Sequence, residues 1–333
     1  MALSVQRAGI LSTLQDLGRY GSQRFGVPVG GVMDEYSHRV ANLVVGNDEH
    51  EATLEITLAG PRLEFTHDAL IGLCGGAFDS TIDGSAVPMA RPLLVRAGSV
   101  LDIGRCRLGC RAYLAVAGGF DVPRVMGSKS TYLRGGFGGF EGRALRRGDL
   151  LPTGEARTTL YPELEGGAAG GTSFCFPRWS VKANSAFLAH SHHRIRFVPG
   201  RHWERFSESN RQQFCTAEFR IGPDSDRMGY RLEGPALDLD PSLEIQSEAV
   251  TFGSIQVPPD GHPIVLMATR QTIGGYPRIG EVASVDLPLL AQLPPRDTVR
   301  FEPVTLETSQ GLYLQREREL ALTRASLAMR MQA

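Results

Sequence analysis

The chain has 333 residues with 35 basic and 36 acidic side chains, and its formal net charge of -1 gives no electrostatic reason to expect nucleic acid or an anionic membrane as a partner. Its length exceeds the size that one hydrophobic core usually supports, so we expect two domains. A hydrophobic content of 42% is sufficient for packed cores and excludes a disordered chain.

The cysteines and the N-terminus indicate a cytoplasmic protein. Five cysteines without dense spacing are typical of a reducing compartment. Cys106 and Cys110 have the spacing of a metal-binding pair, but no second Cys/His pair accompanies them. The first ten residues lack a basic region followed by an apolar run, and no apolar stretch reaches the ~18 residues of a membrane span.

Short strands punctuated by glycine and proline are predicted for the first half of the chain. One early helix is expected over Asp34–Val45, with Asp34 as its N-cap. Asp83-Gly84 is expected to form a type I′ hairpin turn. The strands are expected at Leu54–Leu58, Arg62–Phe65, Ala69–Cys74, Ser80–Gly84, Pro92–Arg96, Val100–Ile103 and Ala112–Ala117.

A second strand-rich block follows two small, polar, Gly-rich stretches, Thr153–Thr159 and Glu165–Thr172, which are typical of a linker or surface loop. A short helix is expected over His202–Phe214 and an amphipathic helix over Glu307–Met331. The strands of this block are expected at Ile195–Val198, Ala217–Ile221, Leu243–Ile245, Ser254–Val257 and Pro263–Met267.

Both halves share a plan of strands, Gly-rich turns and a short Gly/Asp turn into a strand, which favours two related barrels in tandem. The fold class is therefore mainly β with a few helices. We expect the first barrel domain over residues 1–175, the second over 193–305 and a C-terminal helix over 306–333.

Three loops combine turn formers, charged groups and an aromatic residue, as binding loops often do. They are Val27-Pro-Val-Gly-Gly-Val-Met-Asp34, Asp224-Ser-Asp-Arg-Met-Gly-Tyr230 and Arg270-Gln-Thr-Ile-Gly-Gly-Tyr-Pro277. We expect them to assemble one site on a β-rich scaffold. Each also has a structural interpretation: a strand connection capped by Asp34, a surface salt bridge in a turn, and a tight turn with a packed tyrosine.

Candidate roles follow from residue type. Arg227 and Arg19 suit recognition of a substrate carboxylate, and Asp34 or Asp226 suits proton transfer, with Tyr230 as a further catalytic candidate. Amide, hydroxyl and backbone donors at a strand end suit a developing oxyanion, with an aromatic wall beside them. These candidates are Gln271, Thr272, Gly274, Gly275 and Tyr276. Arg134, beside the Gly135–Gly142 stretch, is a further candidate for binding a carboxylate or an ordinary part of a surface loop.

Other motifs are incomplete. Gly127-Ser-Lys-Ser130 lacks the first glycine of a P-loop, so ATP binding by this chain alone is not expected. Lys129 between Ser128 and Ser130 is compatible with a Ser/Lys amidase, but the Gly/Ser-rich stretch that positions such a triad is absent. His190, His192 and His193 have no nearby carboxylate in the sequence, so no metal site is expected.

The ordered motifs resemble a known family. They are Asp16–Gly21, Gly26–Pro28, Gly31–Asp34, Ala41–Leu43, Leu54–Ile56, Ala112–Gly119, Gly127–Thr131, Gly138–Arg143, Ser225–Leu232, Gln256–Gly261 and Gln271–Pro277. Together, from about residue 4 to about 305, they resemble the biotin-dependent carboxyltransferase family, subdomains A and B. Its members are also called the 5-oxoprolinase C subunit, KipA or allophanate hydrolase subunit 2. Two departures are Cys74-Gly-Gly-Ala, where many relatives have Thr-Gly-Ala, and Lys129 in place of a common arginine.

The resemblance implies two cyclophilin-like β-barrels and an obligate companion, the KipI-like B subunit, with a separate A subunit in the oxoprolinase. The chain has no Met-Lys-Met biotinylation site, so no covalently bound cofactor is expected. ATP would be used by the complex. Carboxybiotin would be carried by a partner under the carboxyltransferase alternative.

Three functions stay open. The first choice is the C subunit of an ATP-dependent 5-oxoprolinase, a hetero-oligomeric hydrolase that opens 5-oxoproline to L-glutamate. The second is a module that transfers carboxyl from carboxybiotin to urea or a related amide. The third is a KipA-like regulator that binds a KipI-like kinase inhibitor.

Overall fold

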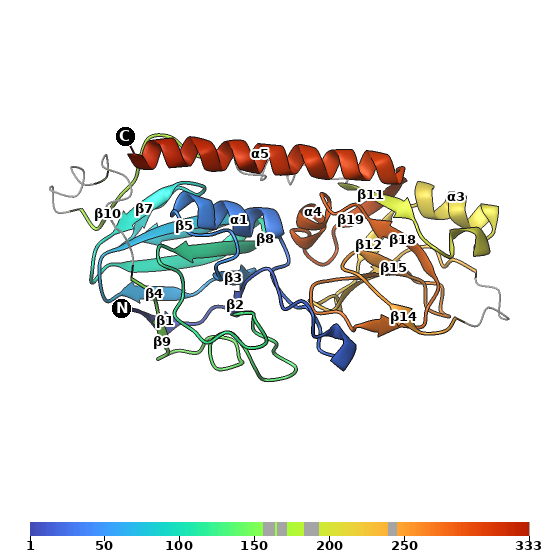
Figure 1. Ribbon diagram of the computed structural model, residues 1–333, viewed down its shortest axis with the longest axis horizontal. Coiled ribbons are helices and arrows are strands. Elements are labelled where there is room, and N and C mark those ends of the chain that lie inside the picture. Colours follow the sequence, from blue (N-terminus) through green and yellow to red (C-terminus); the bar gives the residue numbers. More distant parts are fainter. Residues whose placement is uncertain (156–163, 165–171, 183–192, 239–244, 333) are drawn as a thin grey trace. The chain divides into compact units, whose positions relative to one another are not determined.

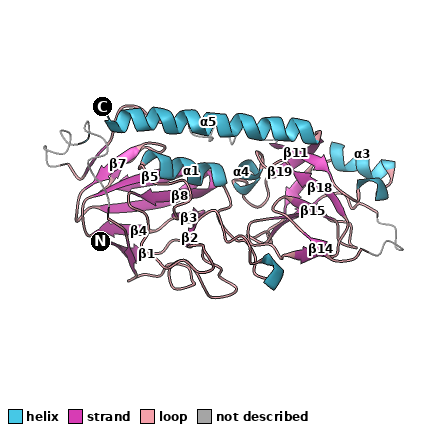
Figure 2. Cartoon of the chain, in the orientation of Figure 1, coloured by secondary structure: helices cyan, strands magenta, loops and turns pink. Residues whose placement is uncertain are grey.

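A computed structural model describes residues 1–155, 164, 172–182, 193–238 and 245–332 of the chain (Figure 1). It is mainly β with a few helices, as the sequence predicts (Figure 2). The chain forms two compact units. The first unit contains residues 1–18, 34–188 and 318–333, and the second contains residues 19–33 and 189–317.

The first unit is built on a ten-stranded sheet in which β10, β7, β5, β8, β4, β1 and β9 lie side by side in that order. Strand β2 pairs with β3, β3 also pairs with β8, and β6 pairs with β5. The strands are β1 Ala2–Arg7, β2 Leu11–Gln15, β3 Thr53–Thr57, β4 Arg62–Phe65, β5 Ala69–Ile82, β6 Ser85–Ala86, β7 Pro92–Val95, β8 Val100–Val116, β9 Leu150–Pro152 and β10 Phe174–Cys175.

Two pairs of predicted strands are continuous in the structure. β5 joins the segments predicted at 69–74 and 80–84, and β8 joins those at 100–103 and 112–117. The β5–β8 pairing shifts register between Gly75 and Ala77 and again before Ser80. Gly75 has a φ of +116°, which glycine adopts without strain. The glycines that suggested breaks in the sequence therefore lie at irregularities within long strands.

The predicted helix is confirmed as α1, Glu35–Val44, with Asp34 as its N-cap. The predicted turn is also confirmed, since Asp83 and Gly84 have φ values of +47° and +82°. Helix α1 packs on β5 and β8 (Figure 1). Gly72 of β5 allows this packing, because a Cβ there would lie 2.4 Å from the Val44 side chain.

Seven strands of the second unit close into a barrel in the order β11, β18, β15, β16, β13, β12 and β19. The barrel strands are β11 His193–Pro199, β12 Phe219–Ile221, β13 Gly229–Glu233, β15 Ser254–Gln256, β16 Ile264–Leu266, β18 Arg278–Val282 and β19 Thr298–Pro303. A separate two-stranded sheet pairs β14, Glu248–Ala249, with β17, Ile273–Gly274.

The core of this barrel is aromatic. Phe214 stacks on Phe301 with ring centroids 4.6 Å apart, and Phe197 meets Phe214 edge to face at 5.2 Å. Phe214 comes from helix α3, Glu208–Thr216, which begins after the N-cap Ser207. The predicted helix over 202–214 is thus divided into a 3-10 turn, η4 Trp203–Arg205, and α3.

The segment of residues 19–33 belongs to the second unit although it lies early in the chain. It contains a short 3-10 turn, η1 Gln23–Phe25, and Met33, whose fully buried side chain is part of the barrel core. The division of the chain is therefore not sequential, because a strand-to-helix connection in the sequence contributes to the second core.

The C-terminal helix is α5, Leu306–Gln332, close to its predicted bounds. A shorter helix, α4 Leu287–Ala291, precedes β19. Within the described part of the chain, no helix is long and apolar enough to cross a membrane. The Gly-rich stretch at 165–172 and the strand predicted at 243–245 lie largely outside the described residues, as does most of the stretch at 153–159.

Candidate functional site

The three loops singled out in the sequence meet within the second unit. The guanidinium of Arg227 donates a hydrogen bond to the carbonyl of Gly31. The backbone carbonyl of Arg227 accepts a hydrogen bond of 2.8 Å from the N–H of Thr269, next to the third loop. Arg227 therefore links the first and second loops to the residue that precedes the third, from a position where only 8% of its surface is exposed.

A cavity of about 260 Å³ opens beside this junction. This volume is below the ~300–1,000 Å³ of sites for drug-sized ligands, so it suits a small molecule. The predicted residues Asp226, Gln271 and Tyr276 line it. Its other lining residues are Asp224, Met228, Gly229, Arg231, Gln256, Ile264 and Leu266.

The floor of the cavity is a row of residues across three neighbouring barrel strands. Arg231 of β13 pairs with Ile264 of β16, which pairs in turn with Gln256 of β15. Along β13, Tyr230 and Leu232 are buried in the core, whereas Arg231 is exposed. Because side chains alternate along a strand, Arg231 points away from the barrel interior.

The third loop forms a wall of the cavity through its contact with Gln256. The side-chain amide of this buried glutamine donates to the carbonyl of Tyr276 at 3.4 Å. A Cβ on Gly274 would lie 2.5 Å from the Gln256 amide nitrogen. Gly274 therefore allows the loop to lie on the barrel, while Tyr276 remains 45% exposed beside the cavity.

The second loop forms the opposite wall. One carboxylate oxygen of Asp226 accepts hydrogen bonds from the N–H groups of Met228 and Gly229, at 2.7 and 3.2 Å. The hydroxyl of Ser225 accepts a hydrogen bond of 3.1 Å from the N–H of Arg231. These bonds hold the loop that leads into β13 and so set the direction of the Arg231 side chain.

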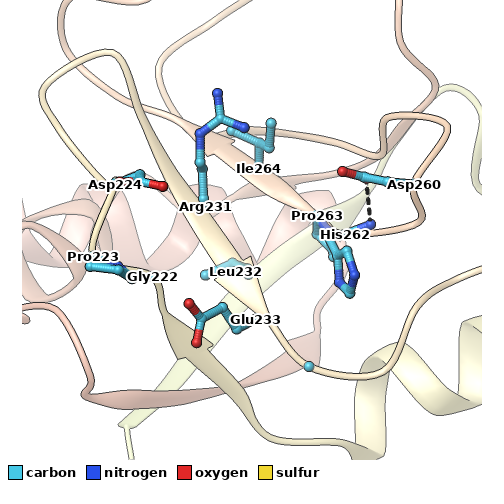
Figure 3. Close-up of a pocket in the computed structure, with 11 residues that line it drawn as sticks. Gly222, Pro223, Asp224, Arg231, Leu232, Glu233, Asp260, His262, Pro263 and Ile264 are labelled. Carbon is cyan, nitrogen blue, oxygen red and sulfur yellow. Dashed lines mark hydrogen bonds between the residues drawn. The ribbon is translucent and has the colours of Figure 1, made fainter.

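A second cavity, of about 340 Å³, shares Asp224, Arg231 and Ile264 with the first (Figure 3). Its remaining polar side chains are Glu233, Asp260 and His262, and the N–H of His262 donates to Asp260 at 3.0 Å. The wall common to both cavities thus carries one guanidinium and one carboxylate.

The other predicted residues of the second unit are not among the residues that line the two cavities. Tyr230 is 2% exposed and packs in the barrel core, and Arg19 is 1% exposed. The N–H of Arg19 donates to the carbonyl of Val29 at 2.8 Å. Thr272 accepts a backbone hydrogen bond of 3.3 Å from Val250, and a Cβ on Gly275 would lie 3.2 Å from the Ser247 hydroxyl.

Asp34 and Arg134 belong to the first unit. The carboxylate of Asp34 is buried and accepts hydrogen bonds from the N–H and hydroxyl of Ser37, at 2.9 and 2.7 Å. Its N–H donates to the hydroxyl of Tyr113 at 2.7 Å, and that hydroxyl donates to Glu55 at 2.9 Å. Arg134 is exposed in the turn before the Gly135–Gly142 stretch.

The first unit also contains a buried carboxylate, Asp16, surrounded by donors. The hydroxyls of Ser128 and Ser130 donate to it at 2.6 Å, as does the N–H of Lys129, and the N–H of Gly18 donates at 2.8 Å. Burial alone would raise the pKa of Asp16, but these hydrogen bonds lower it below the ordinary value. We name these five residues the Asp16 cluster.

The Asp16 cluster gives Lys129 and its flanking serines a structural role. The ammonium of Lys129 contacts Glu51 at 2.5 Å and the carbonyl of Phe120 at 2.7 Å. Both serine hydroxyls donate to Asp16, and no hydrogen bond joins either hydroxyl to the Lys129 ammonium in this described part of the chain. The arrangement needed for a Ser/Lys amidase is therefore not formed here.

His38 is a fully buried residue of helix α1. Its ring nitrogens contact the Thr53 hydroxyl at 2.8 Å and the Glu49 carbonyl at 3.0 Å. A carbonyl only accepts, so Nε2 carries the proton and Nδ1 accepts from Thr53. Burial lowers the pKa of His38 to about 3, which keeps the ring neutral.

Among the described residues, no group of three or more His, Cys, Asp and Glu side chains is arranged to hold a metal. His190 and His192 of the predicted histidine group lie outside that range, and His193 begins β11. Arg231, Asp224 and Gln256 also line the cavity, although they are not among the candidate residues predicted from the sequence. The alternation of the β13 sequence identifies Arg231 once the strand is known to begin at Gly229.

Comparison with known proteins places this architecture in one family. The model of the carboxyltransferase domain, subdomain A and B, matches residues 25–303. The chain is 38% identical to the 5-oxoprolinase C subunit of Escherichia coli, and the alignment covers 92% of both chains. It is 31% identical to urea amidolyase of Saccharomyces cerevisiae, where the alignment covers 93% of this chain but 17% of that protein. The solved structure of the Kluyveromyces lactis urea amidolyase superposes on 97% of this chain and 20% of that protein, with 30% identity and a TM-score of 0.84. The chain therefore belongs to the carboxyltransferase subdomain A and B family.

Proposed function

We propose that the chain is the C subunit of an ATP-dependent 5-oxoprolinase and that the 260 Å³ cavity binds the lactam. The first support is the share of each relative that the alignment covers. Relatives named as the C subunit of 5-oxoprolinase, from Escherichia coli and Haemophilus influenzae, align over 92% and 93% of their own lengths. The urea amidolyase matches cover less than a quarter of those proteins. The expected partners are a KipI-like B subunit together with the A subunit of the oxoprolinase.

The observation that carries the proposal is the convergence of Gln271 and Tyr276 on a small cavity that Arg231 also lines. An amide and a phenol there supply hydrogen-bond donors for the lactam carbonyl. Donors that face the developing oxyanion of an opening amide lower the barrier to reaction. Asp226 and Asp224 supply carboxylates for proton transfer at the same cavity.

The ATP would be consumed by the complex. Gly127-Ser-Lys-Ser130 lacks a P-loop spacing, and two of its hydroxyls are engaged by Asp16. The role assigned to this chain is to bind, orient and polarise the amide, with phosphate chemistry provided by another protein of the complex.

Carboxyl transfer from a biotin-bearing partner to urea or a related amide is the second candidate. The family description and the urea amidolyase relatives favour it. Both reactions require a polarised amide-like carbonyl, so the same cavity serves either chemistry.

The test is co-expression of the chain with its candidate A and B subunits, followed by an assay of ATP-dependent glutamate release from 5-oxoproline. We expect release only when this chain is present. Gln271→Ala should lower kcat by roughly 100- to 1,000-fold, because it removes a donor to the oxyanion. Gln212→Ala, which changes an exposed glutamine of α3, is the matched control and should leave kcat unchanged.

An intact complex of all three proteins that releases no glutamate would contradict the oxoprolinase proposal. Carboxylation of urea that is blocked by avidin, when a biotin-bearing partner is supplied, would then support the second candidate.

A further inference from the structure

Arginines in the strands of the barrel are paired with carboxylates, with Arg231 as the exception among the described strands. Each of the others forms an ion pair, the longest at 3.6 Å: Arg194 with Glu302, Arg196 with Asp286, Arg220 with Glu233, Arg278 with Glu248 and Glu281, and Arg300 with Glu218. The Arg231 guanidinium has neither an ion pair nor a hydrogen bond to any described residue.

Asp224 is an anionic side chain at the same cavities and, like Arg231, has no ion pair within the described residues. Its carboxylate has no hydrogen bond or ion pair to the described part of the chain, in contrast to Asp226, which accepts two backbone hydrogen bonds. Asp224 and Arg231 line both cavities, and Figure 3 draws them on neighbouring segments facing the same space. Two opposite charges therefore belong to the wall that the two cavities share.

The surroundings of Arg231 fix its backbone beside the cavity. Its backbone is fixed by the N–H contact to Ser225 and by the 2.8 Å hydrogen bond that its carbonyl accepts from Gly222. Ile264 beside it in the sheet and the buried Gln256 beyond form the cavity floor. A guanidinium held beside Ile264 at the cavity is well suited to bind a carboxylate through two parallel hydrogen bonds.

We propose that Arg231 binds the carboxylate of the substrate and that Asp224 accepts a hydrogen bond from the adjacent lactam N–H. 5-Oxoproline presents these two groups next to each other, with its ring carbonyl on the far side of the nitrogen. That carbonyl would then face Gln271 and Tyr276. This inference rests on the proposed function, and it makes Arg231 the residue that selects an anionic lactam over a neutral amide such as urea.

The experiment uses the co-expressed complex and compares Arg231→Ala with the wild type. We expect the KM for 5-oxoproline to rise by roughly 10- to 100-fold while kcat changes less than about threefold, because the lost hydrogen bonds are made in the ground state as well as in the transition state. Arg231→Lys keeps the charge without the planar fork and should recover part of the loss.

A second readout separates recognition from a structural role. 2-Pyrrolidone is 5-oxoproline without its carboxylate, and its inhibition constant should be the same for Arg231→Ala and the wild type. Asp224→Asn should weaken both 5-oxoproline and 2-pyrrolidone, because both carry the lactam N–H. Arg300→Ala removes a paired arginine from β19 of the same barrel and serves as the control that leaves KM unchanged.

The outcomes distinguish this inference from the proposed function. A wild-type complex that does not open 5-oxoproline overturns both. An active wild type with a KM unchanged by Arg231→Ala overturns the inference alone, and so does an Arg231→Ala variant that loses 2-pyrrolidone and 5-oxoproline equally.

Discussion

The Asp16 cluster of the first unit and the cavity of the second unit differ in whether their charged groups have partners within the chain. Asp16 is buried and accepts hydrogen bonds from four donors of neighbouring residues. Arg231 and Asp224 lie at a cavity and contact no described charge. A buried charge must be satisfied by the protein itself, whereas a charge held beside a cavity without a partner can be satisfied by a ligand.

Residue type alone therefore does not separate scaffold from site. Both regions contain a serine hydroxyl, a carboxylate and a cationic side chain. The number of internal hydrogen bonds separates them. We expect substitutions in the Asp16 cluster to lower stability, and substitutions at the cavity to lower substrate binding or turnover with little effect on stability.

The largest effect on stability is expected for Asp16→Asn. The amide NH2 group would face hydroxyl and N–H donors, so at least one buried donor would lose its acceptor, at a cost of about 3 kcal/mol in the free energy of unfolding. Urea unfolding of the isolated chain measures it. Asp48→Asn, which alters an exposed carboxylate that accepts one N–H from His50, should cost under about 1 kcal/mol. Equal costs for the two variants would remove the contrast between scaffold and site.

His38 predicts a pH dependence of the first unit. Its pKa is about 3 in the folded chain against an ordinary 6.5, so only the unfolded chain takes up this proton as pH falls from 6.5. The stabilisation is complete above pH 6.5 and should fall by up to about 1.4 kcal/mol per pH unit below it. The pKa of Asp16 is lowered from its ordinary 3.8, so Asp16 changes the free energy of unfolding only near and below that pH. It does not contribute to the pH dependence near pH 6.5.

The measurement for His38 is the free energy of unfolding between pH 5 and 7.5. His38→Gln should reduce the slope relative to the wild type, because the titrating group is removed. A slope that is the same in both proteins would exclude His38 as its source.

A smaller cost is expected for Gly274→Ala at the cavity. The added methyl would press on the Gln256 amide, which must move, so we expect about 1 kcal/mol of destabilisation and a larger relative loss of activity. Gly311→Ala is the control, because it adds a Cβ to an open position on α5. Gly84→Ala would be a poor control because φ is positive there. A Gly274 variant with full activity would show that the loop position is not needed for the site.

The smallest effect on stability is expected for Arg231→Ala. Since its guanidinium contacts no described charge, the free energy of unfolding should change by less than about 0.5 kcal/mol. Thermal or urea unfolding checks this value. A loss above about 2 kcal/mol would assign Arg231 to the scaffold rather than to the site.

Much of the fold follows from the sequence. The regular occurrence of glycine and proline indicated most strands of the first unit, and Asp34 as an N-cap indicated the start of α1. The two long strands were predicted in pieces, because glycine within a strand and glycine at a turn are identical in sequence. Their continuity depends on the partner strand, which accommodates each irregularity through a register shift.

The sequence indicated which loops come together, whereas the roles of their side chains stay a prediction. The three loops do meet, through the contacts of Arg227 with Gly31 and Thr269. Arg227 lies in the second loop and Arg231 directly follows it, and only the start of β13 at Gly229 determines that Arg231 points outward. The membership of residues 19–33 in the second unit likewise depends on tertiary packing, which no local pattern encodes.

Hydrogen exchange of the assembled complex, with and without 5-oxoproline, would locate the substrate site without any substitution. We predict slower exchange in the peptides that cover residues 222–234 and 268–278, and unchanged exchange in the peptides of the Asp16 cluster at 127–131. Protection confined to the Asp16 cluster, or the absence of protection in either cavity segment at saturating 5-oxoproline, would contradict the assignment of the substrate site to the second unit.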